Sequence, residues 1–564
     1  MASIIKKIKK GRSYYYAVKS QRVNGQPRIV WQKYLGTMDA ILQKAETAKP
    51  ALPKEAVIFE SGAVAALLSI ARRLQLMELI NDVLHKRDQG PSVGHYMLLA
   101  ALNRALAPCS KMAIGMWYEQ TVLRRLWGFP KSAFSSQRFW DHMDMMDEAA
   151  IKNVQDLLIS RIKSEFSIDP SLLLYDTTNF FTFLSTSNNR ARIPQRGHSK
   201  AKRHDLRQVG LALLATRDFH VPLMHQVYPG NIPDVSLFPT LSQELIARFT
   251  QLTANNDDIT LVFDKGNVSE TAMENFVMQG KHFVAALSAN RLPELFAVEP
   301  SRFKPLADTP GNTCFATTVE MWGKKVMAVV VYSESFFTQQ LSGISQNMVK
   351  SQKRLHDLQQ SIIKCSMGKK KGKPPTMASV RKNIQDILSA QFMKDILKVH
   401  LEEKGRVPRL QYSVDHLAFQ RLCDQRLGKT LIVTDHLRWT PEEVVKSYRS
   451  LSEIEEIFKH MKNIQFLHWQ PAYHWTDQKL RVHGFYCVMA LLLSTLCRKI
   501  IVQAGIDLSL PALLHELCAI REVALIYPAG ALAHRKNQVT LSRMSSRQKK
   551  LAEVLNIAEI LQRG

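Results

Sequence analysis

Three acidic residues are candidates for a shared metal site. Asp176 lies in the middle of the apolar stretch LLLYDTTNFFTF, and Asp264 ends the stretch DITLVFD. Glu455 follows much later, in YRSLSEIEEIFKHMK. An ionised group inside a buried strand needs a partner or a metal ion. Three converging carboxylates would supply the hard oxygen ligands that Mg²⁺ prefers, and pairs of such ions catalyse phosphoryl transfer on nucleic acids.

The segment around Glu455 has the pattern of an amphipathic helix. Four apolar residues recur at the i, i+3, i+4, i+7 spacing: Ile454, Ile457, Phe458 and Met461. One helix face is therefore expected to be buried, with Glu455 beside it at the edge of a core. Tyr448, Leu451 and Lys462 fall on the same line of the helix surface as Glu455. The alternative is a solvated helix with pairs such as Glu455 and Lys459.

The elements that must position the two aspartates are predicted to be strands alternating with helices. Strands are expected at 172–183, twice within 209–231, at 258–267 and at HFVAALSAN, with helices at DVSLFPTLSQELIARF and SETAMENFVMQG. This order is three strands, helix, strand, helix, strand. It is the beginning of a ribonuclease-H-like α/β fold, in which Asp176, Asp264 and Glu455 would converge.

The remaining chain surrounds and interrupts this predicted core. Residues 291–435 are expected to hold a β-hairpin turning at Trp322, then a helical stretch over 336–404 that is broken at 367–375, then two strands. We divide the chain into a basic β-hairpin element (1–50), a helical DNA-binding region (56–168), the ribonuclease-H-like core in two parts (169–290 and 431–500), an insertion domain with a β-hairpin and a helical arm (291–430), and a helical basic C-terminal region (501–564). For 56–168, plain helical packing is the alternative to DNA binding.

The first 36 residues alternate like strands around Asn24-Gly25, a strong signal for a β-hairpin. A run of lysines and one arginine precedes it: Lys6, Lys7, Lys9, Lys10 and Arg12. A small basic β element would suit contact with phosphates. A solvated sheet edge is the alternative.

The composition favours a polyanionic partner and a reducing compartment. The chain has 564 residues, a formal net charge of +27 and a pI of about 9.8, which points to nucleic acid. Ribosomal and membrane-surface proteins are the other basic classes, but the first are usually shorter and the second need a basic amphipathic segment. Seven scattered cysteines without a CxxC motif indicate a cytoplasmic protein. MASIIKKIKK lacks the apolar core of a secretory signal, and the apolar window 484–497 is too short to predict a membrane span.

Several motifs together resemble one known family. They are YDTTNFF, GHSKAKRHDLRQVGLAL, PLMHQVYPGNIPD, VFDKGN, YRSLSEIEEIFKHMK and PAYHWTDQKLRVHGF. With them the chain resembles the DDE transposases of the IS4 superfamily, and within it the IS1634-like group. The resemblance covers roughly 170–290 and 430–500 well and the termini loosely. It implies an Mg²⁺-dependent enzyme, with Mn²⁺ as a substitute, that carries out cut-and-paste transposition.

The resemblance also implies partners and further site residues. The partners are double-stranded DNA, as terminal inverted repeats and as target, and a second copy of the chain in a synaptic dimer, in a bacterial cytoplasm at the nucleoid. The family's helix motif is Tyr, two residues, Arg, three residues, Glu, six residues, Lys. Here it reads Tyr448, Leu451, Glu455, Lys462, so the arginine is missing and Arg449 is a candidate substitute. The other residues expected to contact DNA are Lys459, Lys200, Arg203, Arg207 and, by stacking on a flipped base, Trp322, for which local packing is the alternative. His204 and Asp205 are expected near the metal, and a structural hydrogen bond is the alternative for His204.

Two other functions share these features. A catalytically inactive or domesticated DNA-binding protein would keep the fold, although three intact acids argue against decay. A hydrolysis-only nuclease would keep the site but would not join DNA ends. The joining of cleaved 3′ ends to a second DNA molecule distinguishes these possibilities from a transposase.

Overall fold

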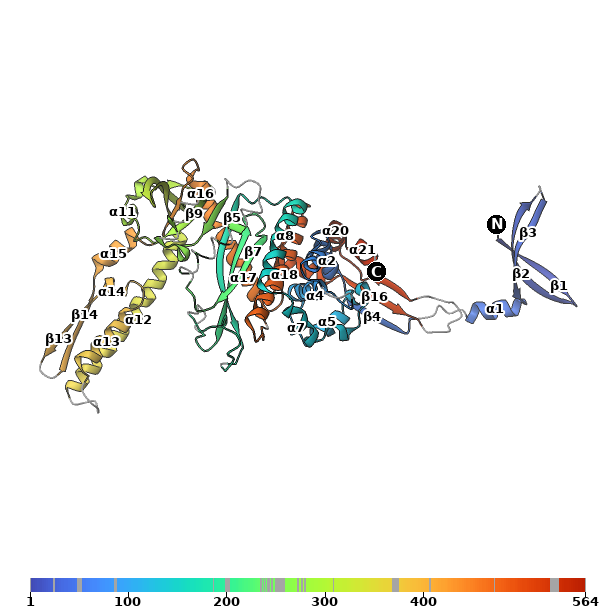
Figure 1. Cartoon of the computed structure of the whole chain (residues 1–564), viewed down its shortest axis with the longest axis horizontal. Helices are drawn as coiled ribbons and strands as arrows, with labels where there is room; N and C mark the ends of the chain where they lie inside the picture. Colours follow the sequence, from blue (N-terminus) through green and yellow to red (C-terminus); the bar gives the residue numbers. More distant parts are fainter. Residues whose placement is uncertain are drawn as a thin grey trace. The chain divides into compact units, whose positions relative to one another are not determined.

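The computed structural model describes most of the chain (Figure 1). The residues outside the description are 1, 24–25, 48–52, 86–88, 186, 198–202, 234–235, 237, 239, 241–243, 245–246, 249–258, 271–272, 275–276, 278–279, 308, 368–374, 405–406, 471, 528–536 and 563–564. By their contacts the residues fall into two compact units. Unit 1 contains Met1–Ala66, Tyr118–Gly128 and His515–Gly564, and unit 2 contains Leu67–Trp117 and Phe129–Leu514.

A mixed nine-stranded sheet forms the centre of unit 2. Its strand order is β10-β11-β12-β15-β9-β8-β5-β6-β7. The strands are β5 (Leu172–Thr182), β6 (Arg207–Thr216), β7 (Pro222–Pro229), β8 (Thr260–Phe263), β9 (His282–Leu287), β10 (Lys304–Pro305), β11 (Asn312–Met321), β12 (Lys324–Ser333) and β15 (Lys429–Thr434). Strands β6, β8 and β9 are almost entirely buried, so their near-continuous apolar sequences fit a sheet that is covered on both faces.

The five strands predicted from the sequence lie next to one another in this sheet. β5, β6 and β7 pair antiparallel, whereas β8 pairs parallel with β5 and β9 pairs parallel with β8. The strands expected to carry Asp176 and Asp264 are therefore confirmed. The helices expected between β7 and β9, over 234–249 and 269–280, lie largely outside the described residues.

Helices pack against the strands of unit 2. α16 (Pro441–Arg449) lies against β9 and β15, α17 (Leu451–Lys462) against β5, and α18 (Asp477–Gln503) against β7 and α4. Thr440 caps the start of α16 in a capping box. Its side chain accepts a hydrogen bond from the backbone N–H of Glu443, and the Glu443 carboxylate accepts one from the backbone N–H of Thr440. The single helix predicted around Glu455 is divided at Ser450, but its expected apolar face is confirmed because Ile454, Ile457, Phe458 and Met461 are all buried.

Unit 2 also contains most of the predicted helical region. Its helices are most of α2 (Gly62–Arg73) and of α5 (Ile114–Glu119), together with α3 (Leu76–Val83), α4 (Val93–Leu106), α7 (Ser136–Asp144) and α8 (Glu148–Phe166). By length and composition α18 could cross a membrane, but 83% of its most apolar window is buried inside the structure. It is therefore a core helix, as the sequence predicts.

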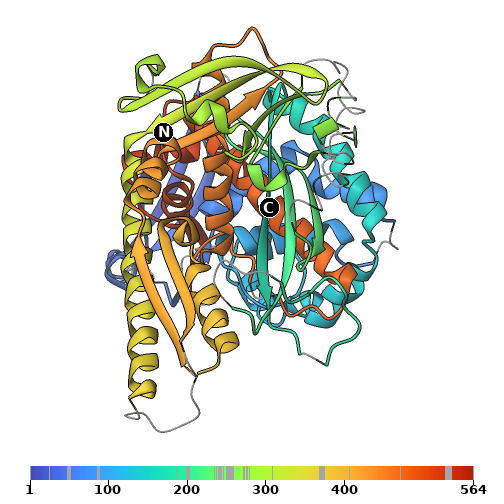
Figure 2. The same cartoon turned by 90° about the vertical axis from the view of Figure 1, so that its left-hand side faces the viewer.

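The insertion after β9 joins the same sheet and then forms an arm. β11 and β12 make the predicted hairpin, and β12 pairs with β15. The arm consists of α12 (Glu334–Ser366) and α13 (Met377–Leu388) beside the hairpin of β13 (Leu397–Lys404) and β14 (Val407–Val414) (Figures 1 and 2). The remaining helices of this segment are α11 (Pro293–Phe296), α14 (Met393–Ile396) and α15 (His416–Gln425).

The prediction of helix up to residue 404 is wrong at its end. Residues Leu397–Lys404 form β13 because they pair antiparallel with β14 over their whole length. Val399 and Leu401 alternate along β13 and pack into the apolar cluster of the arm. This period of two is the strand pattern, and it was hidden among charged residues.

Unit 1 contains two small sheets. The first is β1 (Ala2–Lys9), β2 (Arg12–Val23) and β3 (Gln26–Gly36), followed by α1 (Met38–Thr47). The predicted two-stranded hairpin is therefore a three-stranded sheet. The additional strand β1 turns into β2 at Lys10 and Gly11, whose φ angles of 49° and 73° suit a two-residue hairpin turn. The predicted turn at Asn24-Gly25 lies outside the described residues.

The second sheet of unit 1 corrects the expected helical C-terminus. Its order is β17-β16-β4, formed by β17 (Gln538–Leu541), β16 (Arg521–Ile526) and β4 (Glu55–Glu60). The unit also contains α6 (Leu123–Trp127), the C-terminal part of α19 (Leu510–Cys518), α20 (Ser546–Val554) and α21 (Ile557–Gln562). Residues 521–526 form a strand because β4, far away in the sequence, pairs with them along their whole length.

Candidate active site

The parallel pairing of β5 and β8 brings Asp176 and Asp264 together. Leu174 lies beside Val262 in the register of the two strands. Asp176 and Asp264 each follow two residues later, and the backbone of Asp264 is still extended, with φ −83° and ψ 162°. Since side chains alternate along a strand, a step of two keeps both carboxylates on one face of neighbouring chains. Both residues are half-buried.

Glu455 lies on the same cleft as the two aspartates. Its helix, α17, packs against β5, and Figure 1 shows α17 beside this strand. The cleft has a volume of about 860 Å³. We call it the carboxylate cleft, and its charged lining residues are Asp176, Asp264, Glu455, Lys265, Arg426, Lys429, Arg449, Lys459 and Lys462. The three acidic side chains thus share the cleft with six lysine and arginine side chains.

Tyr448 holds Asp264 in place. The phenol hydroxyl of Tyr448 donates a hydrogen bond of 2.8 Å to Oδ1 of Asp264. Burial raises the pKa of Tyr448 far above its ordinary value, and the negative charges of Asp264, Glu455 and Asp176 raise it further. The hydroxyl therefore stays protonated and remains a donor to Asp264.

Lys462 lies at the other end of the cleft, above strand β5. Its Nζ donates a hydrogen bond of 2.7 Å to Oγ1 of Thr178, two residues after Asp176. The same ammonium lies 5.4 Å from the centre of the Phe180 ring. Lys462 is exposed and lines the carboxylate cleft.

Trp469 connects the strand of Asp176 with the helix of Glu455. Its indole stacks on Phe180 of β5, with ring centres 4.4 Å apart and planes at 9°. Its backbone N–H donates a hydrogen bond of 2.8 Å to the carbonyl of Met461 in α17. Because Trp469 is fully buried, it fixes the distance between the two elements.

The other expected DNA contacts fall into two groups. Tyr448, Arg449, Lys459 and Lys462 line the carboxylate cleft, and so does Leu451 at the family's arginine position. Arg449 is half-buried, and burial lowers its pKa. Arg203, Arg207 and Trp322 are not among the residues that line the cleft.

Arg203 forms an ion pair with Asp205, with Nη2 and Oδ2 2.8 Å apart, and Arg207 donates a hydrogen bond of 3.1 Å to the carbonyl of Asn188. Trp322 packs edge-on against Phe283, with ring centres 5.8 Å apart. Lys200 lies outside the described residues. Contacts of these residues with DNA, and a place for Asp205 and its neighbour His204 near a metal, stay predictions.

Asn267 is a candidate that sequence reasoning did not single out. It lies three residues after Asp264, lines the carboxylate cleft and is only 3% exposed. Its Oδ1 is buried without a hydrogen-bond partner among the described residues, which is a costly state for a polar group unless a ligand supplies the partner. Its fixed spacing from Asp264 in VFDKGN is the signal that could have found it.

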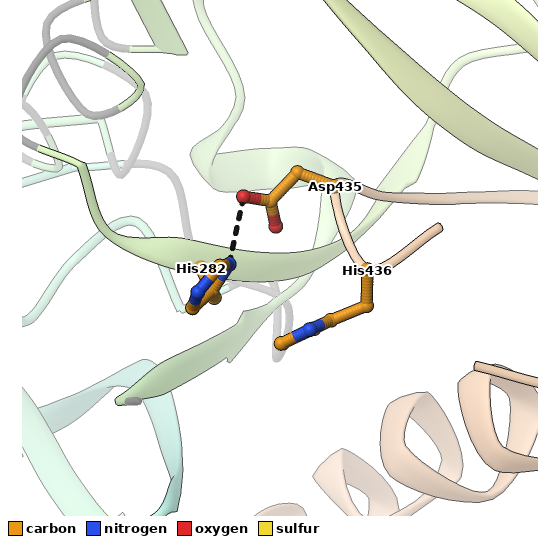
Figure 3. Close-up of side chains that lie close together, drawn as sticks. All are labelled: His282, Asp435 and His436. Atoms are coloured by element: carbon orange, nitrogen blue, oxygen red, sulfur yellow. Dashed lines mark hydrogen bonds and ion pairs between the residues drawn. The ribbon is translucent and has the colours of Figure 1, made fainter. Parts of the chain in front are cut away.

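A second cluster of polar side chains lies at the opposite end of the parallel strands (Figure 3). In it, metal-binding atoms of His282, Asp435 and His436 lie within 4.8 Å of one another. His282 Nδ1 and Asp435 Oδ2 are 2.9 Å apart, and the other oxygen of Asp435 accepts a hydrogen bond of 3.0 Å from the backbone N–H of Phe283. His436 Nε2 lies 2.7 Å from Oγ1 of Thr260.

The rings in this cluster are stacked, which argues for a structural role. The imidazoles of His282 and His436 are 4.3 Å apart at 27°, and His436 stacks on Trp439 at 4.0 Å and 2°. Lone pairs of imidazole lie in the ring plane, so nearly parallel rings do not direct them to a shared ion. The hydrogen bonds and the stack instead join β9 to the residues after β15.

Comparisons with known proteins do not identify a family. No family model matches the chain, and no curated protein matches it. Among solved structures, it is similar to a cryo-electron-microscopy structure of a piggyBac transposase synaptic complex with hairpin DNA. That likeness has a TM-score of 0.38 and 9% sequence identity, and it covers 80% of this chain and 79% of the other. A likeness at this level carries no weight for function, which we infer from the chain's own residues.

Proposed function

We propose that this protein is a DNA transposase of the DDE type, which cleaves the ends of a mobile DNA element and joins them to target DNA. The observation that carries the proposal is that Asp176, Asp264 and Glu455 line one cleft although they come from three separate elements. No other carboxylate occurs among the described residues that line it. The order β7-β6-β5-β8-β9 supports the ribonuclease-H-like interpretation, because it contains the predicted antiparallel and parallel strands in adjacent positions.

The residues of the cleft fit a pair of Mg²⁺ ions. The donor set consists of carboxylates, which are hard oxygen ligands, and Asn267 adds a buried amide oxygen that has no hydrogen-bond partner within the described part of the chain. The ligand oxygens of the three acids do not all lie within 4.8 Å of one another in the described structure. Bound there, the ions would supply Lewis-acid activation of a water or 3′-hydroxyl and stabilise the leaving oxygen.

The chain's own residues have separable tasks in this proposal. Asp176, Asp264 and Glu455 would hold the ions, and Tyr448 orients Asp264 through its hydrogen bond. Lys462, Lys459 and Arg449 would bind the phosphates beside the scissile bond, which places the DNA backbone against the acids. The net charge of +27 supports a polyanionic substrate.

The broader assignment follows the family that the sequence resembles. We propose that the substrate ends are terminal inverted repeats, that two copies of the chain act in a synaptic complex, and that Mn²⁺ can replace Mg²⁺. We also propose that the enzyme works in a bacterial cytoplasm at the nucleoid.

The test is cleavage and joining of a labelled duplex that carries a candidate element end. We expect the wild type to nick this duplex and join its 3′ end to a second DNA molecule in Mg²⁺. Asp176→Asn, Asp264→Asn and Glu455→Gln are expected to abolish both reactions. Glu456→Gln is the matched control, because Glu456 is the next residue on α17, is also exposed and does not line the cleft.

Each outcome has a distinct meaning. Loss of nicking in all three variants, with DNA binding retained and with full activity of Glu456→Gln, supports the three-carboxylate site. Full activity of Glu455→Gln would remove Glu455 from the proposed ligands. Nicking without joining by the wild type would replace the transposase with a hydrolytic nuclease.

A further inference from the structure

The sheet at the start of unit 1 has an extreme charge composition. Residues 2–36 contain nine basic side chains and no Asp or Glu. The basic residues are Lys6, Lys7, Lys9, Lys10, Arg12, Lys19, Arg22, Arg28 and Lys33. All nine are exposed. The strands β1, β2 and β3 therefore form a cationic surface without internal neutralisation.

The two faces of this sheet differ. Tyr14, Tyr16 and Tyr34 share one face, because Tyr14 and Tyr16 are two residues apart on β2 and Tyr16 lies opposite Tyr34 on β3. The ring centres of Tyr14 and Tyr16 are 6.1 Å and 5.2 Å from that of Tyr34. Lys7, opposite Tyr14 in the register, lies 4.9 Å above the Tyr16 ring. We call this surface the tyrosine face.

A cleft of about 530 Å³ opens on the tyrosine face. It is lined by two lysines and three tyrosines: Lys9, Lys10, Tyr14, Tyr16 and Tyr34. The polar side-chain groups of these five residues are ammonium groups and phenol hydroxyls, and each can donate a hydrogen bond. Such a set suits the oxygens of a phosphodiester, which accept hydrogen bonds and carry a negative charge.

We propose that the tyrosine face is a second DNA-binding site, separate from the carboxylate cleft, which binds the phosphate backbone of duplex DNA. The choice of DNA as the occupant rests on the proposed function, and the charge complementarity and donor set of the face argue for it independently. Binding through phosphates is insensitive to base sequence and strongly dependent on salt. The site would add affinity for DNA beyond the segment that undergoes cleavage.

The experiment compares two double variants of the full chain that remove equal charge from opposite faces. Lys7→Gln/Lys9→Gln changes the tyrosine face. Lys6→Gln/Lys33→Gln is the control, because Lys6 lies opposite Tyr15 and Lys33 opposite Ala17, which places both on the other face. Binding of a labelled 40-base-pair duplex is measured by fluorescence anisotropy in EDTA, over a series of NaCl concentrations.

The tyrosine-face variant is expected to bind several-fold more weakly and to lower the slope of log Kd against log salt by about 2, since each lost phosphate contact removes about 0.9. The control variant is expected to keep the wild-type slope. A third variant, Tyr14→Phe/Tyr16→Phe/Tyr34→Phe, retains every charge and is expected to weaken binding through loss of the hydroxyl donors.

Equal losses in the two lysine variants would show diffuse charge attraction and overturn the proposal. Wild-type affinity and slope in the tyrosine-face variant would also overturn it, as would displacement of the duplex by polyglutamate at equal charge concentration. Because EDTA removes divalent ions, this assay does not depend on catalysis. Failure of the proposed function would instead appear as absent cleavage in Mg²⁺ by a chain that still binds DNA through this face.

Discussion

Tyr448 and Asp264 are joined by a hydrogen bond of 2.8 Å between a phenol hydroxyl and a carboxylate oxygen. Tyr448 belongs to α16 and Asp264 follows β8, so the bond ties a helix to the sheet. Since burial and the neighbouring acids raise the pKa of Tyr448 far above its ordinary value, the bond persists over the working pH range. Orientation of a metal-binding carboxylate by such a partner commonly strengthens metal binding.

The first prediction concerns Tyr448→Phe. Removal of the hydroxyl frees Oδ1 of Asp264, so we expect the Mg²⁺ concentration for half-maximal cleavage to rise by about 10- to 100-fold. DNA binding in EDTA should stay at the wild-type level, which separates metal affinity from loss of the fold. An unchanged Mg²⁺ dependence would remove Tyr448 from the positioning role.

The second prediction concerns Trp469, which lies between β5 and α17. We expect Trp469→Ala to lower the free energy of unfolding by about 3–5 kcal/mol, because it leaves a large buried cavity. Trp469→Phe should cost less, since Nε1 of the indole has no hydrogen-bond partner among the described residues. Urea unfolding measures both, and Trp140→Ala is the control because Trp140 is 40% exposed. A cost for Trp469→Ala no larger than for Trp140→Ala would contradict the bridging role.

The third prediction concerns His225 and acid. His225 is buried in β7, where the amide of Gln155 donates a hydrogen bond to its Nδ1. Burial, with a contribution from Arg248, lowers the pKa of His225 from 6.5 to about 3. The unfolded chain therefore binds a proton below pH 6.5 that the folded chain does not, so stability falls as the pH drops from about 6.5 toward 3.

His225 should contribute up to about 1.4 kcal/mol per pH unit to this loss. We expect His225→Gln to reduce the slope of the unfolding free energy against pH by the amount that one proton contributes, between about pH 6.5 and pH 3. Unfolding titrations at pH 7, 6, 5 and 4 measure the difference. Parallel curves for wild type and variant would show that His225 is protonated in the folded protein.

The fourth prediction concerns the ion pair of Arg125 and Glu522 in unit 1. Arg125 reaches both oxygens of Glu522, with distances of 3.2 Å from Nε and 2.7 Å from Nη2, and Glu522 is only 3% exposed. We expect Arg125→Ala to cost about 3–5 kcal/mol, because it leaves a buried carboxylate without its partner. The double variant Arg125→Leu/Glu522→Leu should recover most of that loss in thermal unfolding. A double variant as unstable as the single one would contradict this account.

The parts of the fold that could be predicted are those with a local periodic pattern. The apolar stretches before Asp176 and Asp264 predicted β5 and β8, and the spacing of Ile454 to Met461 predicted the buried face of α17. Strands that depend on a distant partner were missed. β16 pairs with β4, from which most of the chain separates it in sequence. β13 carries so many charged residues that its alternation of apolar and polar side chains does not stand out.

In the candidate site, too, some features could be predicted from the sequence and others could not. Motif spacing was sufficient to select Asp176, Asp264 and Glu455, which line one cleft. The hydrogen bond from Tyr448 to Asp264 and the burial of the Asn267 side chain depend on side-chain packing, which spacing does not report. Trp322 was chosen for its place at a hairpin turn, and its packing against Phe283 depends on where the hairpin joins the sheet.

The pairing of β9 with β15 has a consequence for synthesis of the chain. Ala286 lies opposite Ile432, and the whole insertion separates them. At about 5 to 20 residues per second, a ribosome needs on the order of 7 to 30 s to pass from β9 to β15. During this time the nascent chain carries an apolar strand with one open edge, a template for wrong pairing. The docking of α16, which packs against both β9 and β15, therefore has to wait until β15 has left the ribosome.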